Sequence, residues 1–295
     1  MHFPVSGVEA SPFIPPLVAF VISFFTSMGG LSGAFLLLPF QVSVLGFHSP
    51  AVSATNHLFN VVAIPGGVYR YMREGRMVWP LTMVVVAGTL PGVLAGTLIR
   101  VKYLPNQKDF KLFVGLVLFY IGIRLIKDIL GGSNIPQPQA GMTAVTITHY
   151  GFRQVEYEFQ GNTYKVNSIG IMALSLVVGI IGGVYGIGGG AIIAPFFVSI
   201  FGLPVYTVAG AALMGTFTTS LAAVVIYQLI AGYFQVTAIA PDWMLGILFG
   251  IGGFAGIYCG ARFQKRVPAR VIKWILVFCV MLPAIQYIWE FASAG

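Results

Sequence analysis

The sequence has very few charged side chains. Asp, Glu, Lys and Arg make up 8% of its 295 residues, against about 25% in an average soluble domain. So few charges cannot cover a water-facing surface around a core of this size. Because 57% of the residues are apolar, the composition excludes a soluble enzyme and predicts a protein that crosses the membrane several times.

Cysteine is scarce as well, and paired carboxylates are lacking. Cys259 and Cys279 are the two cysteines, each within an apolar run, so the chain lacks the ligands of a metal cluster and the many pairs of a disulfide scaffold. The predicted spans contain neither matched carboxylates nor a Ser/His/Asp set. We therefore expect no enzyme activity, no metal and no cofactor.

The net charge of +8 does not indicate a nucleic-acid partner. The basic residues fall in short clusters between apolar runs, where they set the topology of membrane proteins. The expected partners are the lipid bilayer and a small anion, and assembly into a homo-oligomer is an open possibility.

Apolar windows of about 20 residues, the length that crosses a bilayer, recur along the chain. They predict an all-α polytopic membrane protein with eight transmembrane helices. A polar segment, residues 131–167, separates the fourth helix from the fifth. The predicted spans are 13–40, 50–69, 78–99, 110–130, 168–200, 205–231, 241–263 and 270–290.

The polar segment 131–167 contains two alternating runs, Thr143–Tyr150 and Gln154–Phe159, on either side of Gly151. Alternation of this kind predicts a small β-hairpin outside the membrane. A plain connecting loop is the alternative.

The chain repeats itself at an offset of 156 residues. Pro, Phe, Val, Ser and Gly of the segment Pro39–Gly46 recur at matched positions in Pro195–Gly202. We therefore predict two homologous four-helix repeats, residues 1–130 and 168–295. Glycines four residues apart mark faces where membrane helices pack closely. Each repeat has one such ladder, which is Gly88, Gly92 and Gly96 in the first and Gly252, Gly256 and Gly260 in the second.

Glycine clusters interrupt the first span of each repeat. A broken helix in hydrocarbon leaves backbone groups unpaired, so a break persists where protein, water or a ligand satisfies them. The short helix after each break would direct its N–H groups into a central cavity, which favours an anion. Close packing alone is the alternative role. The candidate substrate-binding residues of the two clusters are Gly30, Ser32, Gly33, Gly186, Gly188, Gly189 and Gly190.

Polar residues of the second span add side chains to this site. Asn56, His57 and Asn60 share one helical face, and polar residues within a span face a partner helix or a water-filled pathway. His57 is also the candidate for proton coupling, because imidazole titrates near neutral pH. A satisfied structural histidine is the alternative. Thr216 and Thr219 complete the candidates, although threonines also bond to their own helix.

These features resemble the sulfite exporter TauE/SafE family of membrane permeases. The resemblance rests on Gly-x-Ser-Gly at residues 30–33 and Gly-Ile-Gly-Gly-Gly at 186–190, each followed by a Pro-Phe…Gly segment. It covers nearly the whole chain. It implies a secondary transporter that moves sulfite, an organosulfonate or a similar sulfur-containing anion across the cytoplasmic membrane by alternating access. The first repeat departs from the fuller glycine motif at Ser32 and Ala34.

Two other functions fit the same composition. An anion channel would conduct through the cavity without alternating closure. A membrane scaffold would recruit a partner through residues 131–167.

The basic residues also predict an orientation. If the repeats run parallel, nine Lys and Arg residues of the third connections lie on one side, which would be cytoplasmic. Both termini and residues 131–167 would then face outward. Inverted repeats are the alternative. The nine residues are Arg100, Lys102, Lys108, Lys111, Arg262, Lys265, Arg266, Arg270 and Lys273.

Overall fold

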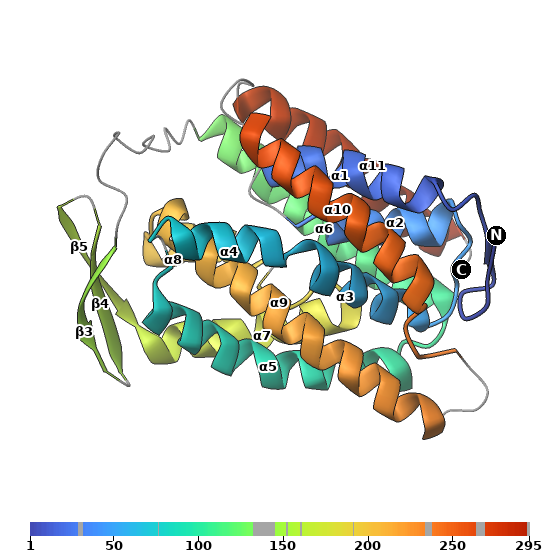
Figure 1. Cartoon of the computed structure of the whole chain (residues 1–295), viewed down its shortest axis with the longest axis horizontal. Coiled ribbons are helices and arrows are strands. Elements are labelled where there is room, and N and C mark those ends of the chain that lie inside the picture. The colour runs from blue at the N-terminus through green and yellow to red at the C-terminus, as the bar shows by residue number, and fades with distance from the viewer. Residues whose placement is uncertain are drawn as a thin grey trace.

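The fold is that of a computed structural model, which describes residues 1–28, 32–75, 77–131, 145–151, 153–159, 161–190, 192–233, 238–263 and 269–293. Within these ranges the chain is mostly helical, as predicted, and carries two small antiparallel sheets. Figure 1 shows the helices as an elongated bundle with the larger sheet at one end.

Along the sequence, some helices precede the larger sheet and the others follow it. Those before it are α1 (Ile14–Met28), α2 (Ala34–Ser43), α3 (Ala51–Ala63), α4 (Pro65–Arg73), α5 (Trp79–Lys102) and α6 (Gln107–Leu130). Those after it are α7 (Ser168–Tyr185), α8 (Ile193–Phe201), α9 (Val205–Ile230), α10 (Trp243–Phe263) and α11 (Ala269–Ser293), with a 3₁₀ turn, η1 (Ala231–Tyr233), following α9.

The predicted interruptions are present in both halves. The first predicted span is divided into α1 and α2, and the fifth into α7 and α8. Gly186 and Gly188 follow α7 with φ angles of +91° and +79°, a left-handed conformation that a side chain would disfavour. The second predicted span is divided as well, because Pro65 begins a new helix directly after α3.

The larger sheet has three strands in the order β3–β4–β5. They are β3 (Thr146–Tyr150), β4 (Gln154–Phe159) and β5 (Asn162–Asn167). The predicted hairpin corresponds to β3 and β4, while the third strand was missed. Tyr157 of β4 ties the sheet to the helices, since its hydroxyl lies 2.8 Å from Thr207 Oγ1 in the first turn of α9. Burial raises the pKa of the Tyr157 phenol to about 12, so this contact stays neutral.

A second sheet, β1 (His2–Phe3) with β2 (Val8–Glu9), lies near the start of α10. Ser6, in the turn between these strands, donates its hydroxyl to Asp242 Oδ2 at 2.9 Å. The backbone N–H of Asp242 donates in turn to Thr55 Oγ1 of α3 at 2.9 Å. The N-terminal segment and the starts of α3 and α10 therefore meet at one end of the bundle.

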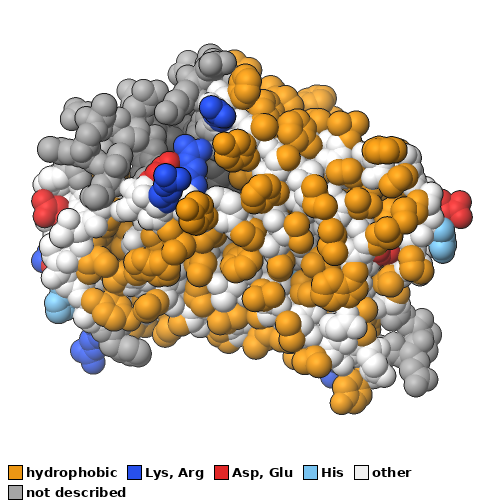
Figure 2. All heavy atoms as spheres, in the orientation of Figure 1, with side chains coloured by type: hydrophobic (Ala, Val, Ile, Leu, Met, Phe, Trp, Pro, Cys, Tyr) orange, Lys and Arg blue, Asp and Glu red, His pale blue; other side chains and the backbone are white. Residues whose placement is uncertain are grey.

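Five helices in the described ranges are long and apolar enough to cross a membrane. They are Trp79–Lys102, Ser168–Tyr185, Thr207–Tyr233, Trp243–Gly260 and Trp274–Ser293. The remaining predicted spans correspond to α6, which has charged ends, and to the divided pairs α1–α2 and α3–α4. Apolar side chains cover the broad face shown in Figure 2, where the basic ones lie mainly toward the end that carries the sheet.

The glycine ladders join the two halves of the chain. A Cβ at Gly88, Gly92 or Gly96 of α5 would overlap a backbone carbonyl oxygen of α7, and the ladder of α10 lies against α1 in the same way. The overlapped carbonyls belong to Met172, Leu176 and Ile180 in α7, and to Pro16, Phe20 and Phe24 in α1. Each residue of the first set lies 156 positions after one of the second. The close-packing role predicted for the ladders is therefore confirmed, and it operates between halves.

The chain turns back after each glycine break. Phe201, at the end of α8, packs on Gly170 in the first turn of α7, so α8 returns toward the end where α7 began. In the first half, Gly33 lies against Ser23 and Ile22 of α1, which shows a similar return. Figure 1 places the start of α1 at the end of the bundle with the termini and the start of α7 at the end with the larger sheet. The second half therefore begins at the opposite end from the first.

One predicted placement is therefore wrong. We expected both termini and residues 131–167 on one side, but the termini lie together at one end and the sheet, residues 146–167, lies at the other (Figure 1). The predicted grouping of nine basic residues on one side of the membrane is wrong for the same reason. Lys102 and Lys111 flank the α5–α6 turn at the end with the termini, whereas α10 runs parallel to α1 and places Arg262 at the opposite end.

Candidate functional site

The two glycine breaks meet at α3. The side-chain amide of Asn56 donates hydrogen bonds to the carbonyl oxygens of Ala34, at 2.9 Å, and Gly186, at 3.0 Å. Its Oδ1 accepts a hydrogen bond of 3.2 Å from Gln41 of α2. One side chain thus joins the start of α2 to the end of α7.

Asn60, one turn further along α3, makes a second connection. Its Nδ2 donates to the carbonyl of Ile187 at 3.0 Å and to Ser220 Oγ at 3.3 Å, while its Oδ1 accepts from Ser32 Oγ at 3.0 Å. Backbone carbonyls freed by a helix break must find donors in a membrane interior. The two amides supply donors to the carbonyls of Gly186 and Ile187, which follow the end of α7, and this explains locally why the second break is tolerated. We call the buried polar residues around these contacts the central cluster, which comprises Ser32, Asn56, His57, Asn60, Thr216, Thr219 and Ser220.

The second-half glycines pack on α9. Thr219 Oγ1 accepts a hydrogen bond of 3.0 Å from the backbone N–H of Gly189, so this predicted residue does contact the break. Thr216 donates instead to Ala212 of its own helix at 2.9 Å. A Cβ at Gly188 would lie 2.9 Å from Thr216 Cγ2, and one at Gly190 would overlap the Ala212 carbonyl.

His57 lies at the edge of the central cluster. Its Nδ1 is 3.2 Å from Ser220 Oγ, and its ring centroid is 6.2 Å from that of Tyr227. The backbone carbonyl of Gly183 interacts with the ring, yet Nε2 makes no well-formed hydrogen bond within the described part of the chain. His57 is fully buried.

The structure therefore brings most of the predicted site residues together. Ser32, Asn56, Asn60 and Thr219 are bonded to the breaks, and Gly188 and Gly190 contact Thr216. Gly33 stands apart, because it packs between Ser23 and Phe59. Gly30 lies outside the described residues. All described side chains of the cluster are at most 7% exposed, so the arrangement is closed to solvent and its polar groups largely satisfy one another.

Three residues near the cluster were missed by the prediction. Gln41 is fully buried beside Asn56, and the Tyr185 hydroxyl donates to the carbonyl of Phe35 at 2.6 Å, another contact between the two breaks. Arg100, which was grouped above with the basic residues of one membrane side, is fully buried and donates through Nε to Ser53 Oγ at 3.3 Å. The spacing could have revealed it, since Arg100 follows Gly96 by four residues and continues the ladder that faces α7.

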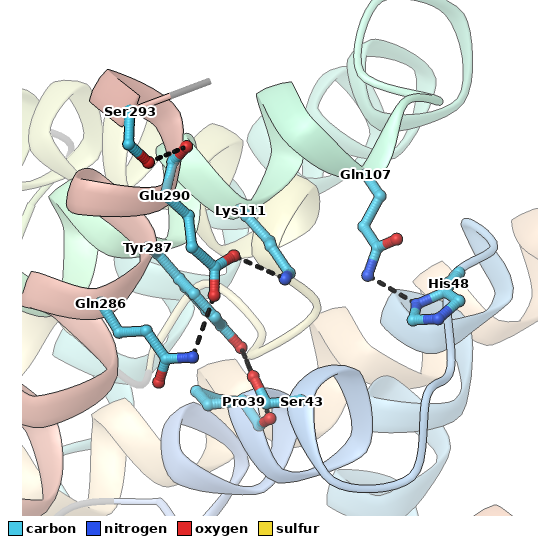
Figure 3. A network of polar contacts seen from close by, with 9 residues as sticks. All are labelled: Pro39, Ser43, His48, Gln107, Lys111, Gln286, Tyr287, Glu290 and Ser293. Atoms are coloured by element: carbon cyan, nitrogen blue, oxygen red, sulfur yellow. Dashed lines mark hydrogen bonds and ion pairs between the residues drawn. The ribbon is translucent and has the colours of Figure 1, made fainter.

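A second polar network joins α2, α6 and α11 outside the central cluster. Figure 3 shows Tyr287 of α11 pointing toward Ser43, whose hydroxyl lies 2.6 Å away. Lys111 Nζ of α6 is 2.7 Å from Glu290 Oε2 of α11. The helix that follows the first break is thereby attached to the last helix of the chain. Across the described residues, no three His, Cys, Asp or Glu side chains are grouped so as to hold a metal ion.

Comparisons with known proteins match the chain to one family profile and to a curated relative. The sequence profile of the sulfite exporter TauE/SafE family matches residues 16–287. A similar curated protein is the "Probable membrane transporter protein YunE" of Bacillus subtilis (strain 168), which is 23% identical over 211 residues that cover 70% of this chain and 69% of the relative. No solved structure matches the chain.

Proposed function

Because the chain belongs to the sulfite exporter TauE/SafE family, we propose that it is a secondary transporter for a small sulfur-containing anion such as sulfite or an organosulfonate. The observation that carries this proposal is the meeting of the two glycine breaks, which Asn56 bridges through Ala34 and Gly186. Broken helices that meet between two repeats are the usual location of a transporter's binding site.

We also propose that residues 1–130 and 168–295 are inverted repeats. The matched glycine ladders support this, because α5 packs on α7 as α10 packs on α1. The inversion is supported by the opposite ends of the bundle at which the two halves begin. In such folds one set of helices rocks against the other around a fixed site, which exposes that site to each side in turn.

The anion would bind where the breaks meet. In the closed arrangement the donors of Asn56 and Asn60 are occupied by backbone carbonyls. Opening would exchange these hydrogen bonds for bonds to the anion. The N–H groups of Gly186 and Gly188, which bond to the Gly182 carbonyl, and that of Gly189, which bonds to Thr219, would change partners in the same way. The N–H groups of Gly190 and of the first-half cluster would complete the donors. Ser32, Thr216 and Thr219 would add hydroxyl donors.

His57 is the proposed proton-coupling residue. It is buried beside Ser220 and carries a ring nitrogen without a well-formed partner in the described ranges. If His57 carries the coupled proton, His57→Gln will keep saturable anion exchange but lose its dependence on pH. Retention of the wild-type pH dependence would exclude this role.

The sheet would face the cytoplasm and the termini the outside of the cytoplasmic membrane. The end with the termini has Lys102, Lys108 and Lys111 outside the buried core. The sheet end is richer in basic residues, and an excess of Lys and Arg marks the cytoplasmic side. The described basic residues at or near that end are Arg70, Arg73, Arg124, Lys127, Arg153, Lys165 and Arg262.

Counterflow in proteoliposomes tests the function. Vesicles with purified protein are loaded with unlabelled sulfite or a small sulfonate, and entry of the labelled anion is followed. An alternating-access carrier should show faster, saturable entry when the inside is loaded. Entry that is insensitive to internal anion and does not saturate would indicate a channel, and no entry of any sulfur anion would contradict the proposal.

A further inference from the structure

Arg100 is a buried cation without a carboxylate partner in the described part of the chain. It lies in the last turn of α5 and is 0% exposed. Its Nε donates to Ser53 Oγ at 3.3 Å and its Nη1 to the carbonyl of Leu104. Nη2 makes no well-formed hydrogen bond to any described residue.

The surroundings of this guanidinium are neutral. Its Cζ lies 3.7 Å from the centroid of the Phe110 ring, and the phenol of Tyr227 interacts with it from α9. Removing a cation from water is costly unless an opposite charge accompanies it. An anchoring role alone would be served as well by a neutral side chain, so the retained charge indicates a ligand that brings a negative one.

Arg100 is also close to the second glycine break. Ser53, which accepts from its Nε, donates to the carbonyl of Val184 at 3.2 Å near the end of α7. A Cβ at Gly186 would lie 2.7 Å from Ser53 Cα. One serine therefore separates the guanidinium from the segment that Asn56 bonds to α2.

We infer that Arg100 binds the charged group of the anion, at a site formed with Ser53 and Tyr227 where α7 ends. This inference rests on the proposed function, and it assigns recognition of the substrate's negative charge to one residue. A guanidinium offers parallel N–H donors that match two oxygens on one atom. The site therefore selects sulfite or sulfonate oxygens over chloride.

The positive charge of the proposed site comes from Arg100, which lies in the first half of the chain. Arg100 continues the first ladder by one step of four residues, and the sequence has Gln264 at the matched step after Gly260. A transporter with this arrangement would bind the anion nearer the end of the bundle that carries the termini.

Equilibrium binding to the purified full-length protein tests the inference. The melting temperature in detergent is measured against increasing sulfite, methanesulfonate and chloride for wild type, Arg100→Gln, Arg100→Lys and Lys102→Gln. Lys102 is the matched control, because it is exposed and lies two residues along the same helix. Counterflow is measured on the same four preparations.

The inference predicts saturable stabilisation of wild type and Lys102→Gln by a sulfur oxyanion. Arg100→Gln should weaken the apparent affinity at least about tenfold, as when one member of a buried charged pair is removed. Arg100→Lys should keep some binding but lose the preference for oxyanions over chloride. If Arg100→Gln does not fold, the Arg100→Lys preference decides the question.

Unchanged affinity in Arg100→Gln, or unchanged oxyanion preference in Arg100→Lys, would overturn the inference. If wild type shows counterflow in that case, the proposed function stands without this site. If wild type neither binds nor exchanges any sulfur anion, the function and the inference both fail.

Discussion

Asn56 of α3 donates a hydrogen bond of 3.0 Å to the carbonyl oxygen of Gly186, 130 residues later in the chain. The same amide bonds to the carbonyl of Ala34 at 2.9 Å, so a single buried side chain contacts the backbone at both glycine breaks. At the second break it supplies a donor to a carbonyl beyond the end of α7, which a membrane interior would otherwise leave unpaired. It also places the breaks where an anion could compete for the same donors.

The first prediction concerns this amide. Asn56→Leu should lower the free energy of unfolding by about 1 to 3 kcal/mol, because the carbonyl of Gly186 loses its donor. Thermal unfolding in detergent measures the loss, and counterflow should be abolished. Gln228→Ala is the control, because Gln228 is exposed and bonds only to Trp243 among the described contacts. Equal stability of the two variants would contradict the bridging role.

The second prediction concerns the two ladders. Gly92→Val and Gly256→Val should destabilise the protein by similar amounts, about 1 to 3 kcal/mol each, because each added side chain would overlap a backbone carbonyl of the opposite half. Gly232→Val is the matched control, since no atom lies within 4 Å of a Cβ there. Folded yield and unfolding in detergent measure the effect. A large effect at one ladder with none at the other would show that the ladders are not equivalent.

The third prediction concerns orientation. In a background with Cys259 and Cys279 replaced by serine, Ser11→Cys and Glu158→Cys should react with a membrane-impermeant thiol reagent from opposite sides. Both positions are exposed, Ser11 near the N-terminus and Glu158 on β4. Ser11→Cys should react in intact cells, and Glu158→Cys only after the membrane is opened. Labelling of both from the same side would refute the inverted arrangement.

A fourth prediction concerns the Lys111–Glu290 pair of Figure 3. Their side chains are 22% and 41% exposed, so solvent screens their attraction, and a double-mutant cycle of Lys111→Met and Glu290→Gln should give a coupling of about 1 kcal/mol or less. Unfolding in detergent provides the four values. A coupling several times larger would mean that this pair, rather than apolar packing, fastens α6 to α11.

The sequence predicted the local features of the fold better than the course of the chain through the helical bundle. Glycine spacing alone identified the α5 and α10 faces at Gly92 and Gly256, and the glycine clusters located the interruptions near Gly33 and Gly186. Hydropathy could not show that α2 and α8 return, because an apolar run with a central break has the same composition whether it crosses or turns back. The error in the side occupied by the sheet followed from that ambiguity.

The candidate site was likewise predicted in part. Helical spacing placed Asn56, His57 and Asn60 on one face, and the structure turns that face to the breaks. It could not predict that the amides bond to backbone carbonyls of the second break, since Gly186 and Ile187 lie more than 100 residues away from them. Arg100 was read as an interfacial charge because basic residues near span ends usually reach water, and its burial depends on packing between halves.

The current of wild-type proteoliposomes on a solid-supported membrane tests transport of sulfur anions most directly. The protein is challenged in turn with sulfite, thiosulfate, methanesulfonate, sulfate and chloride over a range of pH. A secondary transporter for sulfur oxyanions should give a saturable response to one class of sulfur oxyanion and little response to chloride. A response of similar size to every anion, or none to any sulfur anion, would contradict this function.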